Sequence, residues 1–334
     1  MKRFYLGIIF LGVTTLIGNA QDPHYSQFQA APLVVNPAYT GMFEGQWRFM
    51  SNYRSQYGNL VAPFVTTTIA MDTKIGGAEG SGENPFNVGM QFMNDRTMLG
   101  IFSSNYITGT ASYQVKLDKD RNKTLGLGLA GTYGSRHIDF NSVDFDAQFT
   151  SGGFDRSLPT GETVLQNMKS FISVGAGLLF AAEGKEGRSY LELGVSGYNL
   201  NEPKQTVLQD DRQFIPRRYA ALITYKKMLN DDALIAFRAL YQQQSTVKYT
   251  IVNVSAARLL SMEGTDMVGL GAWYRTGEGI SPYVFLEYSN MQIGFSYDIA
   301  TNRFRVGANP ARSFEMSFQL RLTHHVDRMK CIRL

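Results

Sequence analysis

From about residue 46 onwards, apolar and polar side chains alternate along the chain in segments separated by polar or glycine-containing breaks. Successive side chains of a strand point to opposite faces, so this alternation predicts strands with one apolar and one polar face. The last segment, 313–322, shows the pattern most clearly. Its apolar positions are Phe314, Met316, Phe318, Leu320 and Leu322, and its polar positions are Ser313, Glu315, Ser317, Gln319 and Arg321.

The alternating pattern recurs along the chain and predicts about 14 strands. An even number is typical of single-chain bacterial membrane barrels, in which closure of the sheet removes every edge strand. No stretch after residue 20 resembles a transmembrane helix. The strands are predicted to centre near residues 51, 68, 90, 111, 130, 175, 194, 223, 238, 253, 271, 285, 295 and 318.

The connections between the predicted strands favour a membrane barrel over a soluble β-sandwich, whose strands would alternate as well. In outer-membrane barrels the periplasmic turns are short and the external loops are longer. The long connections 141–168, 200–216 and 300–312 all follow odd-numbered strands, and those after even-numbered strands are short, except for the Gly-rich stretch 73–84. We therefore predict an all-β fold, a transmembrane antiparallel β-barrel over residues 46–322 that is preceded by an N-terminal pre-barrel segment.

The N-terminus has the layout of a signal peptide for export. Lys2 and Arg3 precede the mostly apolar run 4–17, which is too short for a membrane-spanning helix, and we expect cleavage after Ala20. The only cysteine, Cys331, lies in a basic C-terminal tail, 323–334, so it can neither accept a lipid at the cleavage site nor form an internal disulfide.

The composition argues against nucleic acid as a partner. The formal net charge is +4, and loss of Lys2 and Arg3 with the signal peptide leaves +2, whereas nucleic-acid binding usually requires a clustered basic face. The 18 Tyr, 22 Phe and 33 Gly, with 18% charged residues, suit a protein made of strands with aromatic edges.

No motif in the chain points to an enzyme, a metal site or a bound cofactor. Gly126, Gly128 and Gly131 match the spacing of a dinucleotide fingerprint, but they lie in an alternating strand pattern rather than at a turn from a strand into a helix. We interpret them as small lumen-facing residues. His324 and His325 are neighbours, and in an extended chain they would point to opposite faces and could not chelate one ion together.

The segment 21–45 differs from the alternating remainder of the chain, because aromatic and apolar residues are frequent in it without a strand pattern. Asp22 and Pro23 resemble the cap and first residue of a short helix, which Pro32 is predicted to end. We expect this segment to pack in the barrel lumen or at its periplasmic mouth. It is either a structural plug or a surface that contacts a partner.

Several stretches of the chain resemble the PorP/SprF family of type IX secretion-associated membrane proteins. The N-terminal run is the most specific part of the resemblance, and the strand motifs add to it. The stretches are 21–28 (QDPHYSQF), 31–33 (APL), 36–41 (NPAYTG), 52–57 (NYRSQY), 271–275 (GAWYR), 293–299 (IGFSYDI) and 313–317 (SFEMS).

The resemblance implies a non-enzymatic outer-membrane barrel of Bacteroidetes, in contact with membrane lipid. It would support export or surface attachment of large proteins such as gliding adhesins, by contacting the client's C-terminal targeting domain and components of the translocon. The polar lumen face would equally support the alternative, a porin or small-solute transporter. The candidate partner-binding residues are Asp22, His24, Tyr25, Gln27, Phe28, Asn36, Pro37, Tyr39, Arg54, Arg275 and Asp298.

Overall fold

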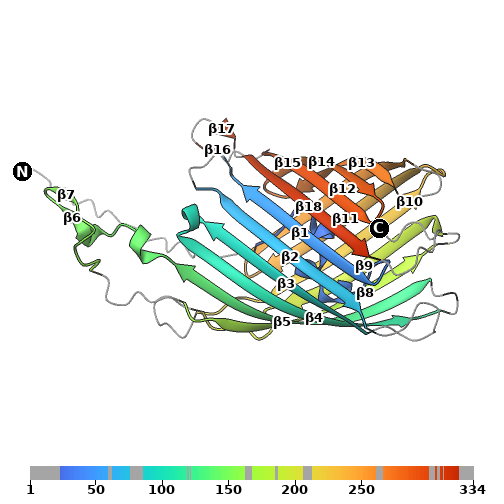
Figure 1. Ribbon diagram of the computed structural model, residues 1–334, viewed down its shortest axis with the longest axis horizontal. Coiled ribbons are helices and arrows are strands. Elements are labelled where there is room, and N and C mark those ends of the chain that lie inside the picture. Colours follow the sequence, from blue (N-terminus) through green and yellow to red (C-terminus); the bar gives the residue numbers. More distant parts are fainter. Residues whose placement is uncertain are drawn as a thin grey trace, which may run out of the picture.

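The protein is a closed antiparallel barrel of 14 strands in a computed structural model (Figure 1). The prediction of about 14 strands is confirmed, and every predicted centre falls within an observed strand. The strands are β1 (Trp47–Gln56), β2 (Phe64–Lys74), β3 (Phe86–Thr97), β4 (Phe102–Lys116), β5 (Lys123–Ile138), β8 (Phe171–Glu183), β9 (Ser189–Tyr198), β10 (Arg218–Met228), β11 (Ala233–Gln244), β12 (Val247–Leu259), β13 (Met267–Arg275), β14 (Gly279–Tyr288), β15 (Met291–Ala300) and β18 (Arg312–Leu322).

The structure describes residues 23–58, 62–75, 86–118, 120, 122–161, 168–184, 187–205, 213–260, 266–300, 305–306, 309–310 and 312–322. The predicted signal peptide, the C-terminal tail, Asp22, both histidines of the pair 324–325 and Cys331 lie outside these residues. The barrel closes where β1 pairs with β18, in a register that runs from Trp47 opposite Leu322 to Ser55 opposite Phe314.

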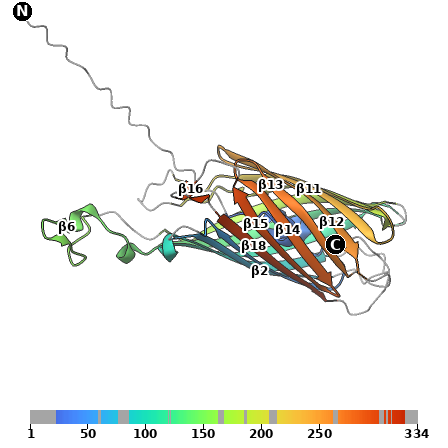
Figure 2. The same ribbon diagram turned by 90° about the horizontal axis from the view of Figure 1, so that it is seen from above.

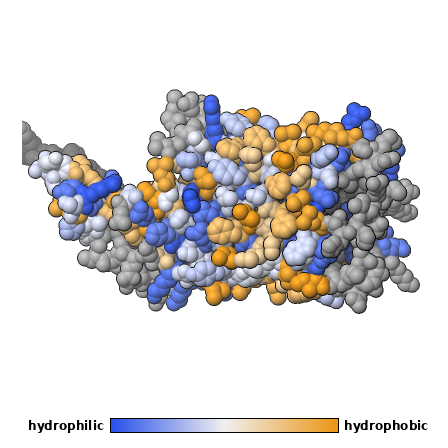
Figure 3. Space-filling model, in the orientation of Figure 1, coloured by the Kyte–Doolittle hydropathy of each residue, from blue (hydrophilic) through white to orange (hydrophobic). Residues whose placement is uncertain are grey.

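The two faces of the strands meet different surroundings, as the alternation predicts. In β18 the side chains of Ser313, Glu315, Ser317, Gln319 and Arg321 are buried inside the barrel. The outer wall carries exposed apolar residues such as Leu129, Ile172 and Leu270, and Figure 3 shows apolar side chains spread over it. Among the described residues, no helix has the length and apolar character to cross a membrane.

The two ends of the barrel differ in their connections. One, the long-loop end, carries the connections 139–170, 199–217 and 301–311, which confirms that the long connections share one end. The other, the short-turn end, carries short turns and also the Gly-rich stretch 73–84 that was the exception in sequence. Two small hairpins, β6 (Phe149–Thr150) with β7 (Gly153–Phe154) and β16 (Arg305–Val306) with β17 (Asn309–Pro310), lie at the long-loop end, with short helices η3 (Met98–Gly100), η4 (Phe140–Ser142) and η5 (Asp146–Gln148) (Figure 1).

The N-terminal segment runs through the inside of the barrel (Figure 2). It forms η1 (Phe28–Ala30), α1 (Pro32–Val35) and η2 (Pro37–Tyr39). The predicted helix from Pro23 to Pro32 is wrong, because residues 23–25 are not helical and Pro32 begins a helix instead of ending one. Proline is well suited to the first helical position, where its missing N–H costs no hydrogen bond.

Candidate functional site

The candidate site is the lumen segment, residues 23–45, together with the barrel wall that surrounds it. The segment begins at the long-loop end, where His24 lies beside Glu278 in the β13–β14 turn. It leaves at the short-turn end, where the Gln46 N–H donates to the Leu322 carbonyl at 2.8 Å. The lumen is therefore threaded by the chain from one end to the other.

At the long-loop end, the segment is held by a set of charged and polar residues that we call the mouth cluster. Arg54 is buried and lies 3.4 Å from both Glu278 and Asp298, and 3.7 Å from Glu315. Arg275 donates to Glu278 at 2.8 Å and to the Ser26 hydroxyl at 3.1 Å. The cluster consists of His24, Ser26, Arg54, Arg275, Glu278, Asp298 and Glu315, which come from the segment, β1, β13, β15, β18 and one turn.

Glu315 connects the cluster directly to the backbone of the segment. Its two carboxylate oxygens accept the N–H groups of Ser26 and Gln27, each at 2.8 Å. Gln27 is fully buried and donates to Ser296 and to the Glu315 carbonyl, both at 3.0 Å, and it accepts the Ser317 hydroxyl at 2.6 Å. Buried polar groups cost free energy unless they are paired, so these bonds specify one seated position of the segment.

His24 lies in the cluster as a neutral imidazole. Its Nε2 is 2.6 Å from the Arg275 guanidinium and 3.7 Å from a Glu278 oxygen. Burial, and then the positive charge of Arg275, lower the pKa of His24 to about 4. Burial opposes the charge on Glu278, but the positive charges of Arg275 and Arg54 outweigh it and hold the pKa of Glu278 below its usual range. The cluster therefore carries two guanidinium charges against carboxylates, with an uncharged histidine between them near neutral pH.

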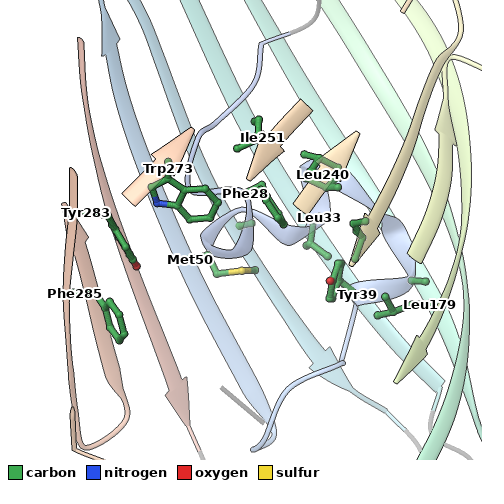
Figure 4. Close-up of a cluster of buried hydrophobic side chains, with 14 of the residues drawn as sticks. Phe28, Leu33, Tyr39, Met50, Leu179, Leu240, Ile251, Trp273, Tyr283 and Phe285 are labelled. Atoms are coloured by element: carbon green, nitrogen blue, oxygen red, sulfur yellow. The ribbon is translucent and has the colours of Figure 1, made fainter. Parts of the chain in front are cut away.

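In the middle of the barrel, the apolar side chains of the segment pack against the inner wall (Figure 4). Phe28 meets the Trp273 ring edge-on, with centroids 5.4 Å apart, and Leu33 is fully buried in the same cluster as Leu240 and Ile251. Each such side chain contributes about 1.5–3 kcal/mol by leaving water. The lumen segment is therefore held both by this apolar packing and by the polar bonds of the mouth cluster.

Glycines in the barrel wall leave room for the tightest part of the segment. A Cβ at Gly128 would overlap the Ala38 nitrogen, and one at Gly177 would overlap the Asn36 side chain. The fully buried Asn36 amide donates to the carbonyls of Leu178 at 2.9 Å and Val195 at 3.2 Å. Gly126 and Gly128 thus face the lumen as predicted and allow a close backbone approach, whereas Gly131 lies on the outer face with open space around it.

At the short-turn end, a second charged pair holds the end of the segment. Arg48 donates to Asp72 through Nε at 2.9 Å and a terminal nitrogen at 2.8 Å, and Asp72 also accepts the Gly41 N–H at 2.7 Å. The Tyr39 hydroxyl donates to Glu192 at 3.0 Å. Burial, followed by the charge of Glu192, raises the pKa of Tyr39, so this hydroxyl remains a donor.

Comparison with known proteins identifies the family. The model for the type IX secretion system membrane protein PorP/SprF matches residues 17–320. The chain belongs to the PorP/SprF family. A search of curated proteins returned no match. With its closed barrel, this PorP/SprF family member is an outer-membrane protein.

Solved barrels are similar to this PorP/SprF protein at low identity. The Ralstonia pickettii toluene transporter TbuX matches with a TM-score of 0.48 and 11% identity over 88% of this chain and 94% of that chain. The Pseudomonas putida toluene transporter TodX matches with a TM-score of 0.46 and 11% identity over 86% and 91% of the two chains. The KdgM porin matches with a TM-score of 0.39 and 8% identity over 82% and 98%.

Residues from separate PorP/SprF motifs meet in space. His24, Arg54, Arg275 and Asp298 all belong to the mouth cluster, although they are up to 274 positions apart in the chain. The remaining described candidates belong to the segment and contact the barrel wall along its length. Tyr25 forms a hydrogen bond with Thr68 of β2, Gln27 forms hydrogen bonds with β15 and β18, and Phe28 packs on Trp273. Asn36 and Pro37 approach the glycines of β5 and β8, and Tyr39 donates to Glu192. All of them are buried or nearly so, and their partner-binding role stays a prediction.

The sequence reasoning did not single out Glu315, Glu278, Arg48 or Asp72. A signal for Glu315 was present, since a carboxylate on the lumen face of the last strand requires a partner. PorP/SprF is a family of secretion membrane proteins rather than of enzymes. Within the described part of the chain, no three His, Cys, Asp or Glu residues gather where they could hold a metal ion.

Proposed function

We propose that this PorP/SprF protein is a non-enzymatic partner of the type IX system that supports export or surface attachment of a large client protein. The observation that carries this proposal is the seated lumen segment, whose His24 and Ser26 meet Arg54, Arg275 and Asp298 of the other family motifs in the mouth cluster at the long-loop end. Membership of a type IX secretion family supports the same reading.

The contact with the client is best placed at the long-loop end. The lumen is threaded by the segment, so a folded client domain has little room there, and the long connections lie at that end with exposed aromatic residues such as Phe149. Exposed apolar groups on a projecting loop are typical of interaction sites. In this mechanism the segment, through its bonds in the mouth cluster, fixes the conformation of the long-loop end. The client's C-terminal targeting domain binds to that end.

The test is a variant in which Tyr25, Phe28 and Tyr39 are all replaced by alanine. The strands satisfy one another's hydrogen bonds, so the barrel should persist in the outer membrane and still migrate faster on gels unboiled than boiled. Surface biotinylation should show that the client is lost or shed, while other type IX enzymes are released near normally.

A matched control removes similar apolar volume from the outer wall, with Ile107→Ala, Leu129→Ala and Ile172→Ala together. These side chains are exposed on the outer face. The control should display the client as the native protein does. Normal client display by the segment variant would mean that the segment is a plug without a partner role.

A further inference from the structure

The lumen segment lies inside the barrel without being part of its sheet. Among the described residues, the backbone of the segment first bonds to the backbone of a strand at Gln46, and the backbone bonds between residues 27 and 42 stay within the segment. The barrel strands satisfy one another's peptide groups. Removal of the segment would therefore break none of the backbone bonds that close the barrel.

Side chains of the wall bind the peptide groups of the segment along its length. In the middle of the barrel, the Tyr198 hydroxyl donates to the Leu33 carbonyl at 2.5 Å. At the short-turn end, the Lys74 ammonium donates to the Phe43 carbonyl at 2.6 Å. The binding side chains come from β1, β2, β4, β9, β10 and β18. The peptide groups bound in this way are the carbonyls of His24, Leu33, Val34, Val35, Tyr39, Thr40 and Phe43 and the N–H groups of Ser26, Gln27 and Gly41.

Such a wall is suited to a polypeptide chain, because every polypeptide carries the same peptide groups. In peptide recognition, main-chain hydrogen bonds give affinity and the places for individual side chains give specificity. Phe28 packs edge-on against Trp273, and Leu33 is fully buried in the same apolar cluster (Figure 4). Asn36 lies against Gly177 and donates to two carbonyls of the wall. These three positions specify which sequence fits the lumen.

From this arrangement we infer that the lumen is a peptide-binding site, that the N-terminal segment is its tethered ligand, and that a matching stretch of another polypeptide can take its place. The occupant carries an aromatic residue, an aliphatic residue five positions later and an Asn-Pro pair that begins three positions beyond that, as Phe28, Leu33 and Asn36-Pro37 do. The inference goes beyond the proposed function, which places a folded client domain outside the lumen. Failure of the peptide to bind would leave that contact at the long-loop end untouched.

The test cuts the folded full chain between the segment and β1. A protease recognition sequence is inserted between Gly45 and Gln46, and the purified protein is cut in detergent micelles and incubated with a fluorescent synthetic peptide of residues 23–45. The labelled peptide should replace the severed segment, which fluorescence anisotropy and mass spectrometry would detect. A peptide with Asn36→Ala should bind about tenfold or more weakly, because two wall carbonyls lose their donor. A peptide of the same composition in scrambled order should not bind.

The uncut insertion protein is the control for the place of binding. Its own segment remains tethered and competes at high effective concentration, so the native peptide should bind to it about a hundredfold or more weakly than to the cut protein. Equal binding to the cut and uncut proteins would place the peptide outside the lumen and overturn the inference.

A point substitution makes the test independent of the insertion. In the full chain with Asn36→Ala, the weakened segment should give way to the native peptide, which should bind about tenfold or more tightly than it does to the unsubstituted chain. Asn230→Ala, in an exposed turn at the short-turn end, is the matched control and should bind the peptide like the unsubstituted chain. Failure of the native peptide to bind both the cut protein and the Asn36→Ala chain, or equal binding of the scrambled peptide, would each overturn the inference.

Discussion

A single buried carboxylate, Glu315, links the last strand to the lumen segment. It accepts two backbone N–H groups of the segment and faces the buried Arg54 guanidinium. Breaking a buried ion pair leaves the other charge without compensation, which is costly, whereas exposed pairs contribute little. Residues of the mouth cluster should therefore matter far more to the seating of the segment than the charged pairs on the outer turns.

Glu315→Gln should destabilise the seated segment by about 3 kcal/mol, because it removes a buried charge that holds two N–H groups and Arg54. Native-state proteolysis should show faster cleavage within residues 23–45, with the barrel intact on unboiled gels. Asp232→Asn is the matched control, since its pair with Arg258 is exposed, and it should change stability by less than about 1 kcal/mol. Equal cleavage of the two variants would contradict the role of Glu315.

The seating of the segment should also depend on pH. In a released segment His24 has its ordinary pKa of about 6.5, whereas in the cluster burial and Arg275 lower the pKa to about 4. His24 therefore binds a proton less readily in the seated segment than in the released one. The stability of the seated state falls as the pH drops from about 6.5 towards 4. Because one pKa unit corresponds to about 1.4 kcal/mol, the loss approaches about 3 kcal/mol.

Glu278 acts in the same direction at lower pH, because its pKa is held below the usual range and its contribution falls once the solution is more acidic than a free glutamate's pKa. Protease protection of residues 23–45, measured from pH 7.5 to 4.5, should decrease on acidification. His24→Asn should flatten this profile above pH 5. An unchanged profile in that variant would rule out His24 as the titrating group.

At the scale of elements, β5 and β8 are shaped to receive the η2 turn. Their glycines leave no Cβ where Asn36, Pro37 and Ala38 approach. Gly126 and Gly128 of β5 also belong to the stretch that matches a nucleotide fingerprint in sequence, but their physical role is a close approach of two backbones.

Gly128→Val should unseat the segment, because its side chain would overlap the Ala38 nitrogen, a backbone atom that cannot move alone. We expect the free energy that favours the seated segment to fall by about 1–3 kcal/mol, the usual range for overpacking. Hydrogen exchange of the amides in 36–41 is the measurement. Gly131→Val, three residues along the same strand and facing outwards into open space, is the control and should exchange like the native protein.

At the scale of the whole molecule, the difference between the two ends predicts the orientation in the membrane. External loops of outer-membrane barrels are long and periplasmic turns are short, so the long-loop end should face outwards. Protease added to intact cells should cleave within 141–168 or 200–216 and spare 118–122. A small epitope tag placed directly before Pro23 should be detected on the same side as those loops, because the segment starts at that end. Cleavage at the short turns alone would mean the opposite orientation.

Passage of ions through the barrel should be limited by the lumen segment. In planar bilayers, deletion of residues 23–44 should raise the single-channel conductance several-fold, because the buried side chains of the segment no longer occupy the lumen. A full-length protein that conducts as well as the deletion variant would favour the porin alternative. The deletion variant must retain its gel shift on boiling for the comparison to hold.

The sequence by itself determined the number of strands, the face that most strand residues occupy, with Gly131 as an exception, and the end at which each long connection lies. These features depend on a period of two along a single strand, and lipid outside and polar groups inside impose that period locally. The family motifs also marked Arg54 and Arg275, two residues of the mouth cluster, without showing what they contact.

Only the tertiary structure decided the path of the lumen segment and the partners of those residues. The segment has no repeating pattern, so its short helices follow from packing against the wall. Pro32 begins a helix, whereas the sequence alone predicted that it ends one. The mouth cluster joins residues of the segment, β1, β13, β15 and β18, whose proximity depends on closure of the barrel and on the register of β1 with β18. Contacts between residues this far apart in sequence arise from the closed sheet and not from any local pattern.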